Sequence, residues 1–295
     1  MSPVAEVIED TDVTPQRIKE GVQHLKEWLA KQPHLPNVDD EEWLATFLCQ
    51  CKLSLEKTKS KLDGYFSYRN KYPQFLKNRN PADPEVILAG KSYGMSISSK
   101  LTKSGARILH FAPGEDPSIF DVDALAKRMF MVTDAMYLEK DRHTNYVTVT
   151  DCRHLHYMHF LRGLTRIPQI VDVYVNAYTE RIVSFNIINA PAFINKVVNM
   201  FKNYLPEKIA NRIYIHEKAS ELLECEYVDE DVLAKEFGGN GPSIKEYDDF
   251  TVRLLEKHAG WFAEQESVCS NEELRRKDDA KPEELQGSFR KLEVD

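Results

Sequence analysis

Residues 182–188, IVSFNII, form an almost continuously apolar run, and this run constrains the fold more than any other feature of the chain. A strand that faces water on one side alternates apolar and polar residues, whereas a strand covered on both faces is apolar throughout. Asn189-Ala190-Pro191 follows at once, and a proline at this point is typical of a helix start. The run therefore predicts a central strand covered on both faces and followed by a helix.

The spacing of apolar residues changes at about residue 107. From there on, short runs that alternate or carry β-branched residues favour strands, and segments of helical length lie between them. Strand and helix in alternation are typical of βαβ units. We therefore expect an α/β domain with a mostly parallel sheet. The predicted strands are 107–111, 146–150, 182–188 and 212–215, and the predicted helices are 121–138, 154–179 and 192–204.

The first quarter of the chain follows helical spacing. Thr14-Pro15 combines a capping hydroxyl with a proline at the first helical position. Further helices are predicted around Trp43 and Leu62, and the turn-rich segment 78–85, NRNPADPE, indicates a domain boundary. We expect three parts: an all-helical N-terminal domain over 12–85, an α/β domain over 86–250, and a C-terminal helix with a charged tail over 251–295.

Composition limits the classes of function. Lys and Arg number 39 against 47 Asp and Glu, which gives a formal net charge of -8 and argues against broad nucleic-acid binding. The five cysteines cannot all pair, and the N-terminus lacks the apolar run of a signal peptide. No stretch approaches the about 18 consecutive apolar residues of a spanning helix. We expect a soluble, cytoplasmic monomer with reduced thiols.

No catalytic motif is present. The sequence has no G-x-S-x-G, C-x-x-C or H-E-x-x-H, and its glycine clusters lack the spacing of nucleotide-binding loops. His154, His156 and His159, in HLHYMH, suggest a metal or pH-sensing role, but no carboxylate or thiol within the segment completes a tetrahedral set. Histidines on the surface or at a helix start are the simpler interpretation. We expect no enzyme, no metal and no cofactor.

The segment after Pro191 predicts a helix with a wide apolar face. At about 100° per residue its apolar side chains cover an arc of roughly 160°. An ordinary helix packed on a sheet would account for this pattern. The face consists of Phe193, Ile194, Val197, Val198, Met200, Phe201, Tyr204 and Leu205.

Several motifs occur in series: FNIINAP, then the wide-faced helix, then LPEKIANRI and EFGG, all preceded by the helical segment DDEEWLATFLCQCKLSLEKTKSKLDGYF. This series resembles the CRAL-TRIO lipid-binding family over about residues 12–262, especially its tocopherol-transfer-like and retinaldehyde-binding-like branches. The ending QGSFRKLEVD resembles insect members. The resemblance implies a carrier that binds one hydrophobic molecule, such as a tocopherol, retinoid, carotenoid or similar lipid. It implies transfer between membranes and an apolar pocket closed by a gate helix, 192–205.

The resemblance also assigns residues to the pocket. Helices 121–138 and 168–178 would form walls, and the strands at 146–150 and 182–188 would form the floor. The implied ligand-binding residues are Leu125, Met129, Val132, Met136, Tyr146, Thr148, Thr150, Ile170, Val173, Tyr174, Tyr178, Phe185, Ile187, Ile194, Val197, Val198, Phe201 and Leu205.

Charged residues in the same region carry a second implication. Arg181, Lys208 and Arg212 match family positions that meet phosphoinositide headgroups at an anionic membrane, which implies a transient peripheral association. Glu180 and Arg212 match an acid–base pair that holds an inositol headgroup in the phosphatidylinositol-exchange branch. Solvated charges at the ends of strands and helices are the alternative interpretation.

One departure from the family pattern bears on the ligand. Relatives carry FLRAR where this chain has Phe47-Leu48-Cys49-Gln50-Cys51. Cysteine cannot replace arginine as a bidentate phosphate partner. Three functions stay open: a carrier of a hydrophobic molecule, which we favour, a phospholipid exchange protein, and a scaffold with a vestigial pocket.

Overall fold

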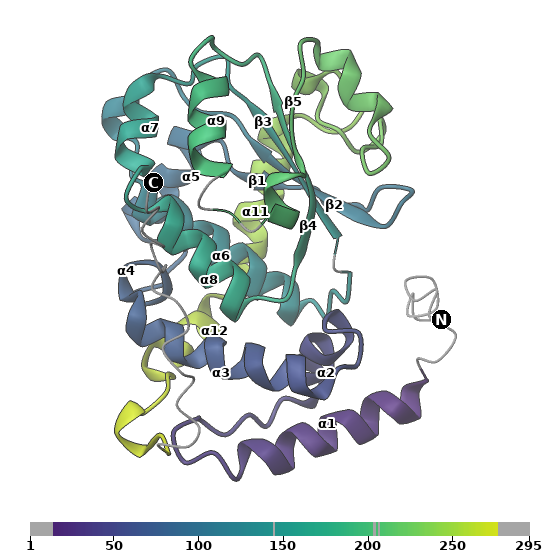
Figure 1. Ribbon diagram of the computed structural model, residues 1–295, viewed down its shortest axis with the longest axis vertical. Coiled ribbons are helices and arrows are strands. Elements are labelled where there is room, and N and C mark those ends of the chain that lie inside the picture. Colours follow the sequence, from purple (N-terminus) through teal and green to yellow (C-terminus); the bar gives the residue numbers. More distant parts are fainter. Residues whose placement is uncertain (1–13, 144, 203–204, 206, 277–295) are drawn as a thin grey trace, which may run out of the picture.

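The computed structural model describes residues 14–143, 145–202, 205 and 207–276 of the chain. Within these ranges a layer of N-terminal helices lies beside a five-stranded sheet that carries further helices (Figure 1). The predicted α/β fold, with a helical region before a mostly parallel sheet, is confirmed. No helix in these ranges is long and apolar enough to cross a membrane.

Each of the first three helices begins at a cap supplied by its sequence. The side chains of Thr14, Asp40 and Ser54 each accept a hydrogen bond from a backbone N–H group in the first turn, which satisfies a donor that the helix itself leaves unpaired. The N-terminal helices are α1 (Pro15–Leu29), α2 (Glu41–Gln50), α3 (Leu55–Lys71), α4 (Pro73–Leu76) and α5 (Pro84–Tyr93).

The strands of the sheet lie in chain order. β1 is antiparallel to β2, and the remaining neighbours are parallel. When parallel strands are added successively on one side through right-handed crossovers, every connecting helix lies on the same face. The strands are β1 (Ser96–Ile97), β2 (Ala106–Phe111), β3 (Asn145–Asp151), β4 (Arg181–Ile188) and β5 (Ile213–Ile215).

Four of the connecting helices, α6 to α9, follow this rule and lie together beside one face of the sheet in Figure 1. The predicted helix 154–179 is in fact two helices. Pro168 lies in the first turn of the second one, where a proline is tolerated, whereas a continuous helix would place it in the interior. The connecting helices are α6 (Val122–Leu138), α7 (Tyr157–Gly163), α8 (Ile167–Ala177), α9 (Ile194–Lys202) and α10 (Glu207–Ala210).

The opposite face of the sheet is covered by chain that follows β5. Leu222, Leu233 and Phe237 share a core with Val147 and Val149 of β3. The covering segment includes the short helices η3 (Ala219–Glu224) and η4 (Lys235–Phe237) and the longer α11 (Ile244–Lys257). Both faces of the central strands are therefore covered, which explains the apolar run in β4.

A β-bulge sets which residues of β4 face the connecting helices. Tyr146 pairs with Ile182, but Val147 pairs with Ser184, so Val183 is an extra residue in the ladder. The side-chain alternation of β4 shifts by one residue at this point. As a result Ile182 faces the same side of the sheet as Phe185, three residues later.

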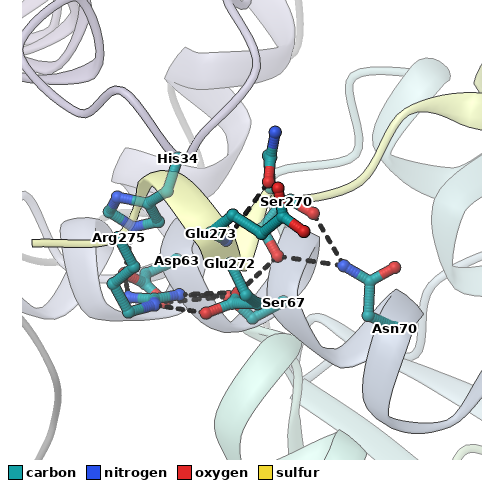
Figure 2. Close-up of polar contacts among 9 residues, drawn as sticks. His34, Asp63, Ser67, Asn70, Ser270, Glu272, Glu273 and Arg275 are labelled. Atoms are coloured by element: carbon teal, nitrogen blue, oxygen red, sulfur yellow. Dashed lines mark hydrogen bonds and ion pairs between the residues drawn. The ribbon is translucent and has the colours of Figure 1, made fainter.

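A polar clasp ties the segment after α12 (Ala259–Glu264) to the N-terminal helices, as Figure 2 shows. Arg275 donates two hydrogen bonds to the Asp63 carboxylate of α3, at 2.8 and 3.0 Å, and a third to Ser67. The buried His34 ring lies 3.1 Å from the same carboxylate. The segment predicted as part of the charged tail is thus held in place as far as Arg275.

Candidate functional site

A cavity of about 390 Å³ lies between the sheet and helices α6 to α9. This volume falls in the range of roughly 300–1,000 Å³ that is typical of small-molecule pockets. Its lining is overwhelmingly apolar, and none of the described residues that line it is Lys or Arg. The cavity can therefore enclose a molecule of low polarity, but its described lining offers no cation to a buried phosphate.

One wall of the cavity is a stripe along α6. Leu125, Met129, Val132 and Met136 all line the cavity, and their spacing keeps them on one face of a helix. Methionine side chains are flexible and fit apolar partners of irregular shape. This wall can adapt to ligands that differ in shape.

The floor is the helix-facing side of β3 and β4. Tyr146, Thr148 and Thr150 alternate along β3 and point to the cavity, as do Phe185 and Ile187 of β4, because residues two apart on a strand share a face. Ile170 and Tyr174 of α8 and Ile194 and Val197 of α9 complete the part of the lining that we expected. Their role in ligand binding stays a prediction.

Helix α8 contacts two neighbours, which divides its predicted face. Val173 and Tyr178 are not among the lining residues; they pack in the core of the N-terminal helices. Helix α3 can approach α8 this closely because Gly64 has no side chain, and a Cβ there would lie 2.2 Å from the backbone oxygen of Asn176. The predicted lining is corrected at these two positions.

The predicted gate helix contributes less to the lining than expected. Val198 is buried but does not line the cavity, and Leu205 is half-buried beyond the end of α9. The Phe201 side chain and residues 203–204 lie outside the described part of the chain.

Other lining residues were not expected from the sequence. Leu109 and Phe111 face the cavity from β2. Ile97 of β1 and Met95, which directly precedes β1, also line it. The alternation in RILHF was a usable signal for the β2 pair. The two-residue strand β1 is too short to show a periodic pattern.

Three polar side chains gather where β3 and β4 begin, and we call them the polar end of the cavity: Tyr146, Tyr174 and Glu180. Neither tyrosine hydroxyl and neither carboxyl oxygen of Glu180 has a hydrogen-bond partner among the described residues. Burial raises the pKa of Glu180 to about 8, against smaller opposing effects of its own backbone N–H group and then of the nearby Tyr137 hydroxyl. At neutral pH this carboxyl group is largely protonated, so all three groups are uncharged donors and acceptors.

The expected pair of Glu180 and Arg212 does not form in the described structure. Glu180 faces the cavity, whereas Arg212 donates from Nη1 to the backbone oxygen of Ile182 at 2.6 Å. Burial lowers the pKa of Arg212, and the nearby charge of Arg181 lowers it further. Arg181 and Lys208 are exposed. The basic residues therefore lie outside the cavity and face solvent or the backbone.

Helix α7 carries apolar side chains toward the cavity and toward solvent. Phe160 and Gly163 line the cavity. Tyr157, Met158 and Leu161 are exposed by 53%, 48% and 40%, and the Tyr157 ring contacts that of Phe160. An apolar helix face normally packs against another element, and this one is open to solvent.

The three histidines of HLHYMH lie in different surroundings. His154 is partly exposed near Glu115, whereas His159 is buried against the cavity and accepts a hydrogen bond from the backbone of His156. In the part of the chain that the structure describes, no group of three or more His, Cys, Asp or Glu side chains could hold a metal ion.

In the FLCQC segment Cys51 is buried, and burial raises the pKa of the Cys49 and Cys51 thiols.

Comparison with known proteins gives matches along most of the chain. Residues 91–239 match the model of the CRAL/TRIO domain, and residues 14–86 match that of the Pinta-like UBA domain. The chain is 21% identical to the alpha-tocopherol transfer protein-like protein of Homo sapiens over 250 residues, 82% of this chain and 71% of the relative. It is 20% identical to Clavesin-2 of Homo sapiens over 280 residues, 89% of this chain and 84% of the relative.

Among solved structures, the crystal structure of Sfh5 matches with a TM-score of 0.47 and 11% identity, over 84% of this chain and 99% of that one. The CRAL/TRIO match spans half of the chain, on the segment that forms the sheet and the helices around the cavity. The chain belongs to the CRAL/TRIO family of lipid-binding and transfer proteins.

Proposed function

We propose that this protein is a carrier, not an enzyme, that encloses one neutral lipid in the cavity and transfers it between membranes. The observation that carries the proposal is the open apolar cavity under α6 to α9. A scaffold with a vestigial pocket would fill this space with side chains. Helix α9 would act as the gate, because Ile194 and Val197 on its inner face close one side of the cavity.

The polar end favours a ligand whose head is a neutral oxygen group. A hydroxyl, phenol or carbonyl group can exchange hydrogen bonds with Glu180, Tyr146 and Tyr174, which lack other partners among the described residues. Leaving such groups unpaired in an apolar site costs about 1–3 kcal/mol each. Lipid alcohols, tocopherols and retinoids have heads of this kind.

Phosphatidylinositol exchange is the second candidate, and the exposed basic residues Arg181 and Lys208 favour it. Within the cavity, however, a phosphodiester would meet no Lys or Arg among the described lining residues. An uncompensated charge in such a place is very costly. We therefore assign the basic residues to the membrane surface and not to a buried headgroup.

The exposed face of α7 supports delivery at a bilayer. Tyr157, Met158 and Leu161 would enter the interface, directly behind the residues of the same helix that line the cavity. Arg181 and Lys208 would add attraction to anionic headgroups, at about 1 kcal/mol for each basic residue near the surface. Docking would thus bring the cavity next to the lipid phase, as a transient peripheral association of a cytoplasmic protein.

Competition binding tests the proposed ligand class. The protein is loaded with a fluorescent neutral lipid and titrated with tocopherol, retinol and phosphatidylinositol. We expect the neutral lipids to displace the probe at concentrations at least about tenfold lower than phosphatidylinositol does. This ratio corresponds to about 1.4 kcal/mol of binding free energy. Displacement by phosphatidylinositol at the lowest concentration would make the exchange function the better assignment. Native mass spectrometry of the purified protein gives an independent check, because a co-purified phospholipid has a distinctive mass.

A further inference from the structure

His159 brings a second polar group into the cavity, away from the polar end. Its side chain lines the cavity, and the residue is only 3% exposed. It packs against the rings of Phe120 and Tyr93, which also contact each other, with centroid separations of 5.2 and 6.2 Å. A buried imidazole in apolar surroundings requires a hydrogen-bond partner.

Within the described part of the chain, only one of the two ring nitrogens has such a partner. Nδ1 accepts a hydrogen bond from the backbone N–H of His156 at 3.0 Å. Nε2 has no partner among the described residues. Because Nδ1 is the acceptor, the proton of the neutral ring is on Nε2, which is then a donor. Burial lowers the pKa of His159, which keeps the ring neutral.

This donor lies at the end of the cavity opposite Glu180. Tyr146 lies at the start of β3 and pairs with Ile182 at the start of β4. Glu180 directly precedes β4. Cys152 follows the other end of β3 and, like His159, lies close to Tyr93. Cys152 is six residue steps along the chain from Tyr146, which corresponds to about 20 Å of extended strand. The lining between the two ends is apolar apart from threonine hydroxyls.

We propose that His159 donates a hydrogen bond from Nε2 to an oxygen atom of the ligand, at the end opposite the head that meets Glu180. The ligand is then an elongated lipid with an oxygen group at each end and an apolar middle. This inference rests on the proposed carrier function and narrows its ligand class. A protonated amine or a purely hydrocarbon end would leave the Nε2 proton unpaired.

Two probes of similar length separate the inference from the carrier function: hexadecanol, and the hexadecanediol that carries a hydroxyl group at each end. Delipidated protein is incubated with an equimolar mixture, and the bound ratio is read by native mass spectrometry. We expect the wild-type protein to bind the diol about fivefold more strongly than hexadecanol, which is the ratio expected from one additional net hydrogen bond. His159→Phe keeps the ring but removes the donor, and it should abolish that preference.

Two further variants make the test specific. His159→Gln retains an N–H donor and should keep a preference for the diol. His154→Phe makes the same substitution at a partly exposed histidine of the same segment that does not line the cavity, and it should behave as the wild type. Thermal unfolding followed by circular dichroism verifies that each variant is folded. Should His159→Phe be unfolded, His159→Leu provides the donor-free comparison.

The outcomes are distinct. Binding of hexadecanol without any preference for the diol overturns the role of His159 and leaves the carrier function standing. A preference for the diol that survives in folded His159→Phe also overturns it. Binding of neither alcohol nor of the neutral fluorescent lipid contradicts both the carrier function and the inference built on it.

Discussion

The carboxylate of Asp134 on α6 forms an ion pair with the guanidinium group of Arg79, and both side chains are almost completely shielded from solvent. The Tyr65 hydroxyl of α3 donates to the same carboxylate at 2.9 Å. The pair therefore links the wall of the cavity to the N-terminal helices through a single buried network. Networks of this kind are sensitive to the loss of one member.

Arg79→Met should destabilise the protein by about 3–5 kcal/mol, because it leaves the Asp134 carboxylate buried without its cation. Urea unfolding measures the change. The double variant Arg79→Met, Asp134→Leu should recover a large part of the loss, and Tyr65 would still have Arg69 as a partner. A double variant less stable than Arg79→Met alone would contradict this account.

Glu180→Gln should stabilise the ligand-free protein increasingly as pH rises. The pKa of Glu180 is about 8 in the folded protein against an ordinary value of 4.5. Between these values the folded state keeps a proton that the unfolded state releases, so the free energy of unfolding falls with rising pH, by at most about 1.4 kcal/mol per pH unit. Glutamine does not titrate. Urea unfolding of both proteins from about pH 5 to pH 7.5 tests this, and parallel profiles would disprove it.

Val197→Asp should abolish retention of a fluorescent neutral lipid. Val197 lines the cavity from α9, and a carboxylate facing an apolar ligand costs several kcal/mol. Asn199→Asp is the matched control on the same helix, because Asn199 is exposed. Equal probe affinity in the two variants would remove α9 from the binding site.

Arg181→Glu combined with Lys208→Glu should slow lipid transfer to anionic vesicles and leave equilibrium binding unchanged. The formal net charge of -8 repels an anionic surface, so attraction depends on local basic residues. Transfer to zwitterionic vesicles is the internal control and should hardly change. An unchanged transfer rate with anionic vesicles would exclude these residues from docking.

Leu161→Asp should slow transfer to anionic and zwitterionic vesicles alike, because it places a charge where we propose insertion into the interface. Leu223→Asp is the matched control: the two leucines are exposed by 40% and 39%, but Leu223 lies on η3, in the segment that covers the opposite face of the sheet. If both variants transferred lipid at the same rate, the exposed face of α7 would have no special part in docking.

The sequence predicted best the parts of the site that depend on a single regular element. The α6 stripe, which the family resemblance assigned, follows helical spacing, so Leu125 and Met129 face the cavity together while other faces of α6 contact neighbouring helices. Helix α8 has two neighbours, and spacing alone could not separate Tyr174, which faces the cavity, from Val173, which faces α3. The single apolar face of α8 thus packs partly against the cavity and partly against the N-terminal helices.

Other features depend on geometry that no local pattern carries. Ile182 enters the lining because the bulge at Val183 shifts the alternation of β4. Glu180 was matched to Arg212 by position in the chain, yet the fold turns one toward the cavity and the other toward a backbone oxygen. His159 presents an N–H donor to the cavity because its other ring nitrogen, Nδ1, accepts the hydrogen bond from the backbone N–H of His156.

The clasp between Arg275 and Asp63 has a consequence for synthesis of the protein. The two residues are 212 positions apart, and at roughly 5–20 residues per second a ribosome needs about 10–40 seconds to add the chain between them. During that interval Asp63 and Ser67 lack the arginine that joins them. The helices made first thus receive their last contacts only after the sheet and the cavity walls have emerged.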